Sequence, residues 1–172
     1  TVWWARRGVS EVDGETVVPE SETICEYLED RGLGASLRPD DPVTTARMRL
    51  LSRIGDLYVM DPMGELFGQI NPAGRDAQLV AREMAELSKA MGWVEHYIDG
   101  PDFAVGDRLT LADCEMVPVL FFFDQIGPMF GYADPLRDYP RAQAYYKGIQ
   151  KTPAAAKVVA ELDAALRRMM GN

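Results

Sequence analysis

The stretch FAVGDRLTLADCEMVPVLFFFDQI, residues 103–126, decides the fold of this chain. Thr110 is followed three residues later by Asp113, which is the spacing of a capping box at a helix start. In such a box the Thr110 side chain accepts a hydrogen bond from the backbone N–H of Asp113. The Asp113 carboxylate in turn accepts one from the backbone N–H of Thr110. The following residues are apolar on all sides of a helix, which predicts a helix buried at the centre of a domain. We therefore interpret Thr110 and Asp113 as structural residues, not catalytic ones.

Helical patterns lie on both sides of this central helix. The spacing of apolar residues predicts helices over about 20–31, 43–61, 77–98, 138–150 and 153–169. The third of these has the most regular apolar stripe, with intervals of three and four residues: Ala77, Val80, Met84, Leu87, Met91, Val94 and Ile98. Such a stripe is typical of a helix that packs along its whole length against neighbours. The predicted fold is therefore mainly α, a bundle of six helices.

The helix over 43–61 carries a second apolar pattern and a set of basic residues. Its predicted buried stripe is Ala46, Leu50, Ile54, Leu57 and Tyr58. Pro62 is expected to kink this helix or to force Asp61 out of it. Arg47, Arg49 and Arg53 form a basic patch. We favour a solvated face or ion pairs across a dimer interface for this patch, with steering of an anionic substrate as the alternative.

A β-hairpin is predicted before the first helix. Asp13-Gly14 is a favourable pair for a type I′ turn, and it lies between Val9 and Val12 on one side and residues 16–18 on the other. Two short strands are only marginally stable alone, so the hairpin must pack against another element. The helix that follows has its apolar residues on one side: Ile24, Tyr27, Leu28 and Leu33.

Composition and charge exclude several classes of protein. The 172 residues are 47% hydrophobic and 26% charged, a normal balance for a globular domain. A net charge of −9 disfavours nucleic acids and anionic membrane surfaces as partners. No apolar run approaches the roughly 18 residues that a membrane helix needs. We therefore expect neither a nucleic-acid partner nor a membrane partner.

The cysteines and the single histidine do not indicate a metal site. Cys25 and Cys114 lie in helical patterns, where cysteine is usually a small core residue. With only two cysteines, a reducing compartment is favoured, so we expect a cytoplasmic protein. His96 has no cluster of Asp, Glu or Cys in the sequence around it, and no metal is expected.

Four motifs, in the right order, resemble the cytosolic glutathione S-transferases. They are Glu20-Ser21-x-x-Ile24-x-x-Tyr27-Leu28-Glu29, Leu37-Arg38-Pro39 with Asp41-Pro42, Phe103-x-x-Gly106-Asp107-x-Leu109-Thr110-Leu111-Ala112-Asp113, and Tyr139-Pro140 with Thr152-Pro153-Ala154. The resemblance implies a remnant of a thioredoxin-like glutathione-binding domain at 1–33, a linker at 34–42 and an all-α C-terminal domain at 43–172. The fold class is then a transferase C-terminal-type helical bundle with a residual β-hairpin and helix.

The same resemblance implies a function and a set of site residues. Glutathione would be the co-substrate, and its thiol would be conjugated to a small hydrophobic electrophile. Glu20 and Ser21 would hold the γ-glutamyl end of glutathione; the alternative is that Ser21 is simply a helix N-cap. Tyr58 and Met60 would contribute to the pocket for the second substrate, although core packing is the more common role for such residues. The family resemblance also implies a homodimer.

The catalytic residue of this family cannot be assigned in the sequence. The family activates the glutathione thiol with a Tyr, Ser or Cys near the start of the thioredoxin-like domain, and binds the tripeptide with a cis-proline. No proline precedes Pro19, and residues 1–7 are too few to form the missing strand and helix. The chain begins at Thr1, so we expect part of the N-terminus to lie outside it. The complete protein is expected to be a transferase and this chain to be impaired or inactive; the alternative is a non-catalytic transferase-like binding or dimerisation module.

Overall fold

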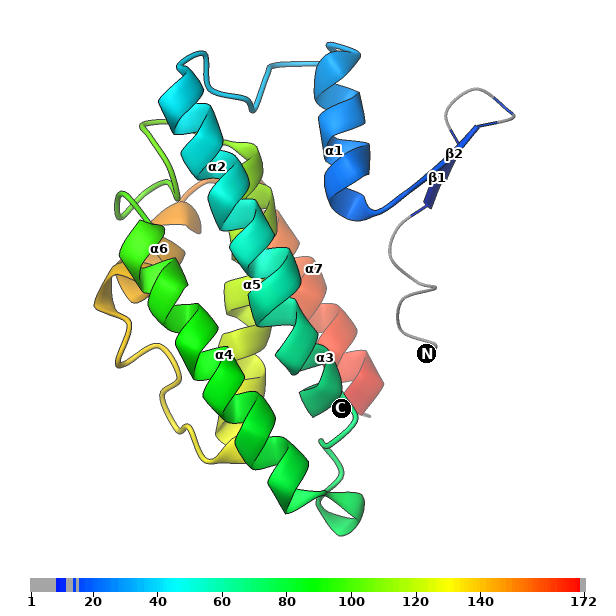
Figure 1. Cartoon of the computed structure of the whole chain (residues 1–172), viewed down its shortest axis with the longest axis vertical. Coiled ribbons are helices and arrows are strands. Elements are labelled where there is room, and N and C mark those ends of the chain that lie inside the picture. Colours follow the sequence, from blue (N-terminus) through cyan, green and yellow to red (C-terminus); the bar gives the residue numbers. More distant parts are fainter. Residues whose placement is uncertain (1–8, 12–13, 15, 171–172) are drawn as a thin grey trace.

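The computed structural model describes residues 9–11, 14 and 16–170, and shows a helical bundle with a small hairpin beside it (Figure 1). The two strands and seven α-helices are β1 (Val9–Glu11), β2 (Val17–Pro19), α1 (Ser21–Asp30), α2 (Pro42–Ile54), α3 (Met60–Phe67), α4 (Ala77–Tyr97), α5 (Leu111–Ile126), α6 (Pro140–Ile149) and α7 (Pro153–Met170). A π-helical turn, η2 (Gly55–Val59), joins α2 to α3, and short 3₁₀ turns η3 (Pro72–Gly74) and η4 (Gly127–Phe130) follow α3 and α5. No described helix is both long and apolar enough to cross a bilayer.

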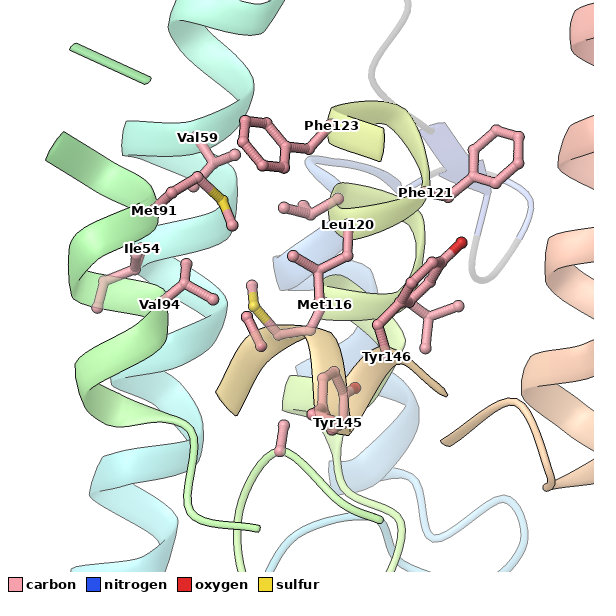
Figure 2. Packing of buried hydrophobic residues seen from close by; sticks show 14 of the residues in the cluster. Ile54, Val59, Met91, Val94, Met116, Leu120, Phe121, Phe123, Tyr145 and Tyr146 are labelled. Carbon is pink, nitrogen blue, oxygen red and sulfur yellow. The ribbon is translucent and has the colours of Figure 1, made fainter. Parts of the chain in front are cut away.

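The central helix predicted from the capping box is α5. Ten of its 16 residues are buried, and it contacts α2, α6 and α7. Figure 2 shows Met116 and Leu120 of α5 between the α4 residues Met91 and Val94 and the α6 residue Tyr145. This confirms the predicted all-α bundle around a buried helix.

The long amphipathic helix is also confirmed, as α4. Five of the seven predicted stripe residues are buried: Met84, Leu87, Met91, Val94 and Ile98. The stripe fades at the start of the helix, where Val80 is half-buried and Ala77 is exposed. The packed part of α4 therefore begins about two turns into the helix.

The helix predicted over 43–61 differs from the prediction in its length. The chain does not leave the helix at Asp61; α3 continues to Phe67, with Pro62 buried in its first turn. A proline lacks the N–H that an interior helical position would use, but a first-turn position needs no such bond. The η2 turn breaks the regular hydrogen-bond ladder before Pro62, and this places the proline at the start of a new α-helical segment. As a result the described part of the chain has seven α-helices, where the sequence predicted six.

The buried face of α2 was also predicted wrongly. Of the five stripe residues only Ile54 is buried; Ala46 is exposed, and Leu50, Leu57 and Tyr58 are between 40% and 50% exposed. The core is contacted instead by the other apolar face, which continues through η2 into α3: Met48, Leu51, Ile54, Val59, Met63 and Leu66. Both faces of this helix are apolar, so periodicity alone could not identify the one that packs on α5.

The hairpin forms, but with a longer connection than predicted. Val9 pairs with Pro19 and Glu11 with Val17, which leaves five residues, 12–16, between the paired strands. A two-residue turn at Asp13-Gly14 would have shifted this register by one residue and exchanged the faces of the strands. Gly14 has a φ of 85°, a conformation that favours glycine.

Helix α1 lies beside α2 and is fixed to it mainly by polar groups (Figure 1). Cys25 packs against the bundle core, and Glu26 forms an ion pair with Arg49 of α2 at 3.0 Å. Of the apolar side predicted for this helix, Ile24 and Tyr27 are half-buried, whereas Leu28 and Leu33 are 45% and 67% exposed. The predicted stripe therefore does not face the bundle.

Candidate functional site

The start of α1 has a strained backbone. Glu20, the residue before the helix, has φ 72° and ψ 119°, and it is the one non-glycine residue with positive φ in the described part of the chain. Such a conformation costs an ordinary residue about 1–3 kcal/mol and is found disproportionately at functional sites. The Glu20 side chain does not cap the helix. The first amides of α1 therefore do not receive the usual N-cap hydrogen bond from the residue before the helix.

A cavity of about 190 Å³ lies next to this helix start. It is formed by residues from α1, η2, α3 and α5, which are Ser21, Asp56, Met60, Glu115, Pro118, Val119 and Phe122. Its polar lining residues are Ser21, at the start of α1, Asp56 and Glu115. The α3 and α5 walls provide apolar surface. The amides at the start of α1 favour an anionic group, and the apolar residues of α3 and α5 favour an apolar one.

The structure brings together two of the residues that the sequence predicts for the site. Ser21 and Met60 line the same cavity, although they lie far apart in the sequence. Glu20 is exposed at the edge, directly before Ser21. Tyr58 is not among the lining residues; it is 50% exposed and stacks edge-on against Trp93 of α4, with ring centroids 5.1 Å apart. The cavity therefore does not support the role predicted for Tyr58 as a contact of the second substrate.

Several lining residues were missed by the sequence analysis. Three of them lie in helical segments whose sequence pattern indicated only a face in the core and a face in solvent: Asp56, Glu115 and Phe122. One usable signal was Gly55 in an otherwise regular helix. A Cβ at Gly55 would lie 2.5 Å from Met116 Cε and 2.9 Å from Glu115 Cγ, so glycine allows α5 to approach η2 closely.

Acidic side chains lie on or close to the cavity lining. Burial raises the pKa of Glu22 above its ordinary value, and the nearby charges of Asp56 and Glu26 act in the same direction. Arg53 Nη1 lies 3.8 Å from Asp56 Oδ2.

The basic patch on α2 forms ion pairs within the chain. Arg47 pairs with Asp99 at 3.0 Å, and Arg49 pairs with Glu26. Together with Arg53 and Asp56, these pairs give each of the three arginines an acidic neighbour in its own chain. All three arginine side chains are more than half exposed, as expected for a solvated face, and the predictions of ion pairs across a dimer and of substrate steering stay untested.

The capping box is present at the start of α5. The Asp113 carboxylate accepts hydrogen bonds from the backbone N–H of Thr110 at 2.7 Å and of Ala104 at 2.8 Å. It also accepts the hydroxyl groups of Thr110 at 3.1 Å and of Tyr145 at 3.0 Å. Burial raises the pKa of Asp113, whereas these four hydrogen bonds lower it, and the effect of burial is the larger. The carboxylate joins α5, α6 and the preceding loop, and Asp113 is not among the residues that line the cavity.

The cysteines are less buried than predicted. Cys25 is half-buried and Cys114 is exposed, because α5 turns that position away from the core. Desolvation raises the pKa of both thiols, to about 11 for Cys114. A thiolate is therefore unfavourable at either position. Among the described residues no three His, Cys, Asp or Glu side chains are grouped as a metal site would require.

Residues 77–148, from the start of α4 into α6, match the sequence model of the family described as glutathione S-transferase, C-terminal domain. The chain is also 25% identical over 153 residues to a glutathione S-transferase of Pseudomonas putida, covering 88% of this chain and 69% of that protein. In sequence, the chain is therefore similar to the glutathione S-transferases.

A second relative and a solved structure show similar agreement. Glutathione S-transferase D6 of Drosophila melanogaster is 26% identical over 165 residues, which is 94% of this chain and 72% of that protein. The crystal structure of a glutathione S-transferase from Methylobacterium radiotolerans superposes with a TM-score of 0.73 at 22% identity, covering 91% of this chain and 76% of that one. This likeness shows that the two chains share a fold.

Proposed function

We propose that this protein binds glutathione at the start of α1 and that, in its complete form, it conjugates the glutathione thiol to a small apolar electrophile. The observation that supports this most directly is the cavity that Ser21 shares with Met60 and the α5 wall. The similarity in sequence to glutathione S-transferases supports the same reaction class. The similar structure from Methylobacterium radiotolerans was solved in complex with glutathione sulfonate, and another from Methylobacillus flagellatus with glutathione bound.

The start of α1, beside the cavity, would hold the carboxylate of the γ-glutamyl group. The positive end of the α1 dipole and its first amides favour an anion, and the Ser21 hydroxyl adds one hydrogen bond. Glu20 would set the direction of these amides through its positive φ. The remaining cavity, beside Met60 and Phe122, would then receive the electrophile.

The conjugation itself forms one carbon–sulfur bond. The thiol proton leaves to solvent, the thiolate sulfur attacks the electrophilic carbon, and the leaving group departs with its electron pair. A hydrogen-bond donor to the sulfur is needed to lower the thiol pKa. We assign no residue of the described chain to that role. The proposed role of this chain is to bind and orient glutathione and the electrophile.

Isothermal titration with glutathione tests this proposal. We expect the chain to bind glutathione with a millimolar or lower dissociation constant, and Ser21→Ala to weaken binding at least tenfold, since the hydroxyl and its orientation are lost. Thr23→Ala is the matched control, because Thr23 is an exposed residue of the same helix outside the cavity lining. A folded wild-type chain without glutathione binding would contradict the proposal and favour the non-catalytic binding or dimerisation module.

For the assembly we propose a cytoplasmic homodimer. Support comes from the outer face of α2 and η2, where apolar side chains are exposed: Val43, Leu50, Leu57 and Tyr58. Contiguous exposed apolar surface of this kind is typical of association sites. Sedimentation equilibrium is the test: Leu50→Glu with Leu57→Glu should convert a dimer into a monomer, and a monomeric wild-type chain at micromolar concentration would overturn this part of the proposal.

A further inference from the structure

A second cavity lies between α5, α6 and α7. It has a volume of about 480 Å³ and shares no lining residue with the cavity beside Ser21. Its walls come from the second half of α5, the segment between η4 and α6, and the two last helices. Part of the wall is apolar: Phe121, Leu136 and Val159. A cavity of this size can enclose most of a small organic molecule.

Tyr146 of α6 contributes a buried hydroxyl group to this cavity. The residue is 8% exposed, and within the described part of the chain its hydroxyl forms no hydrogen bond. The one hydrogen bond at this residue runs from Gln150 Nε2 to its backbone carbonyl oxygen, at 2.7 Å. Figure 2 shows the hydroxyl pointing away from Met116 and Leu120, toward the side of α5 that carries Phe121. Because buried polar groups normally have partners, a hydroxyl left open to a cavity indicates a ligand.

Two carboxylates lie near this hydroxyl. Asp124 is half-buried on α5, and Asp134 lies in the segment before α6. Neither forms an ion pair within the part of the chain that the structure describes, and Asp124 accepts one hydrogen bond, from Gln125 Nε2 at 3.2 Å. Burial raises the pKa of Asp124, and the charge of Asp134 raises it further. Burial and the charge of Asp124 raise the pKa of Tyr146, so the three groups lie within electrostatic reach of one another.

The remaining charges of the lining leave the cavity acidic. Asp163 of α7 also lines it, but forms an ion pair with Arg167 at 2.9 Å. Lys147 is the one basic lining residue in the described part of the chain, and it is exposed. The lining therefore has three aspartates and one lysine. Among the described residues no group of His, Cys, Asp or Glu could hold a metal ion, so the acidic character favours an organic cation.

We propose that this cavity binds a small organic cation, an ammonium group attached to an aromatic or other apolar body. An ammonium group has three N–H donors, and Asp124, Asp134 and the Tyr146 hydroxyl would accept them. The attraction between opposite charges is stronger in a partly desolvated cavity than on an open surface. The apolar body would lie against the apolar part of the wall: Phe121, Leu136 and Val159. Glutathione has a net negative charge at neutral pH, so this site goes beyond the proposed function and does not depend on it.

Three compounds with the same phenylbutyl body test the inference by binding. They are 4-phenylbutylamine, 4-phenylbutan-1-ol and 4-phenylbutanoate, each titrated at pH 7 into the ¹⁵N-labelled full chain without glutathione. We expect the amine to cause saturable amide shifts around Asp124 and Tyr146, and to bind at least tenfold more tightly than the carboxylate. Equal binding of the amine and the carboxylate, or shifts confined to another part of the chain, would overturn the proposal. No binding of the amine would also overturn it, and would leave a cavity that holds water alone.

Two variants test the assigned residues. Tyr146→Phe should weaken amine binding at least threefold without lowering the free energy of unfolding, since the hydroxyl has no internal hydrogen bond to lose. Asp124→Asn/Asp134→Asn should reduce the tenfold gap between the amine and the carboxylate to less than threefold. Asp138→Asn is the matched control, because Asp138 is an exposed residue of the same segment outside the lining, and it should keep the gap. A gap that survives the double substitution, or a Tyr146→Phe chain that binds the amine like the wild type, would contradict the assignment.

Discussion

At the scale of single residues, Asp113 is a buried carboxylate that is held by four hydrogen bonds. It is 2% exposed. Its carboxylate accepts hydrogen bonds from two backbone N–H groups, of Ala104 and Thr110, and from two hydroxyl groups, of Thr110 and Tyr145. The sequence predicted the cap, because a capping box is a contact between residues three positions apart. The hydrogen bond from Tyr145 could not be predicted, since it joins residues 32 positions apart.

Asp113→Asn should destabilise the fold by about 2–3 kcal/mol, because an amide group replaces one accepting oxygen and faces buried donors. Asp107→Asn, in the exposed part of the same loop, should change the free energy of unfolding by less than about 0.5 kcal/mol. Urea unfolding at pH 7 measures both. Equal effects of the two substitutions would show that the buried network is not stabilising.

At the scale of secondary structure, two helical glycines have opposite roles. A Cβ at Gly148 of α6 would lie 1.8 Å from the carbonyl oxygen of Pro101, whereas a Cβ at Gly92 of α4 would meet nothing within 4 Å. The first glycine therefore allows the loop before α5 to cross α6 at close range. The second has no such contact and only lowers helix propensity.

Gly148→Ala should destabilise the chain by about 2–3 kcal/mol, because backbone atoms on both sides would have to move. Gly92→Ala, the same substitution at an exposed helical position, should instead stabilise it by about 0.5–1 kcal/mol. Thermal unfolding of both variants decides the matter. If Gly148→Ala were neutral, the close approach of α6 and the Pro101 loop would be wrong.

The elements also show where prediction from sequence succeeds and fails. Helix α4 was predicted because its apolar stripe is regular, and α5 because a capping box precedes a run that is apolar on all sides. The buried face of α2 was not predicted, because Leu50 and Leu57 form a second apolar stripe. Only the position of α5 determines which of the two apolar faces is buried. The cavity residues Asp56 and Glu115 were missed for a related reason: their proximity depends on the η2 turn, which no local pattern of the sequence indicates.

At the scale of the whole molecule, the attachment of α1 to the bundle determines whether the cavity exists. Ser21 lies on α1, whereas the other walls belong to the bundle. The attachment depends on Glu26, which pairs with Arg49 and Arg38, and on Glu29, which accepts the Leu37 amide at 2.8 Å. These contacts are partly exposed, so each contributes modestly.

This attachment should depend on pH in a defined direction. Hydrogen bonding to Arg49 and the charges of Arg38 and Arg49 lower the Glu26 pKa in the folded state. The folded chain therefore binds this proton less readily than the unfolded chain, so the stabilisation is present above the ordinary pKa of about 4.3 and is lost as pH falls through the folded-state value.

Glu26→Gln should increase hydrogen exchange of the α1 amides at pH 7 by a factor of about 2–5, corresponding to about 0.5–1 kcal/mol. The difference between the variant and the wild type should shrink as the pH falls below about 4 and the Glu26 carboxylate takes up a proton. Glu161→Gln, at an exposed ion pair of α7, should leave α1 unchanged over the same pH range. A difference that stays constant from pH 7 to pH 3 would exclude an electrostatic origin.

A glutathione titration of the ¹⁵N-labelled chain, followed by amide chemical shifts, tests whether glutathione binds where α1 meets the bundle. We predict saturable shifts that are largest at Ser21 and Glu22, with smaller ones at Asp56 and Glu115. Absence of shifts at the start of α1, or shifts confined to another part of the bundle, would contradict it.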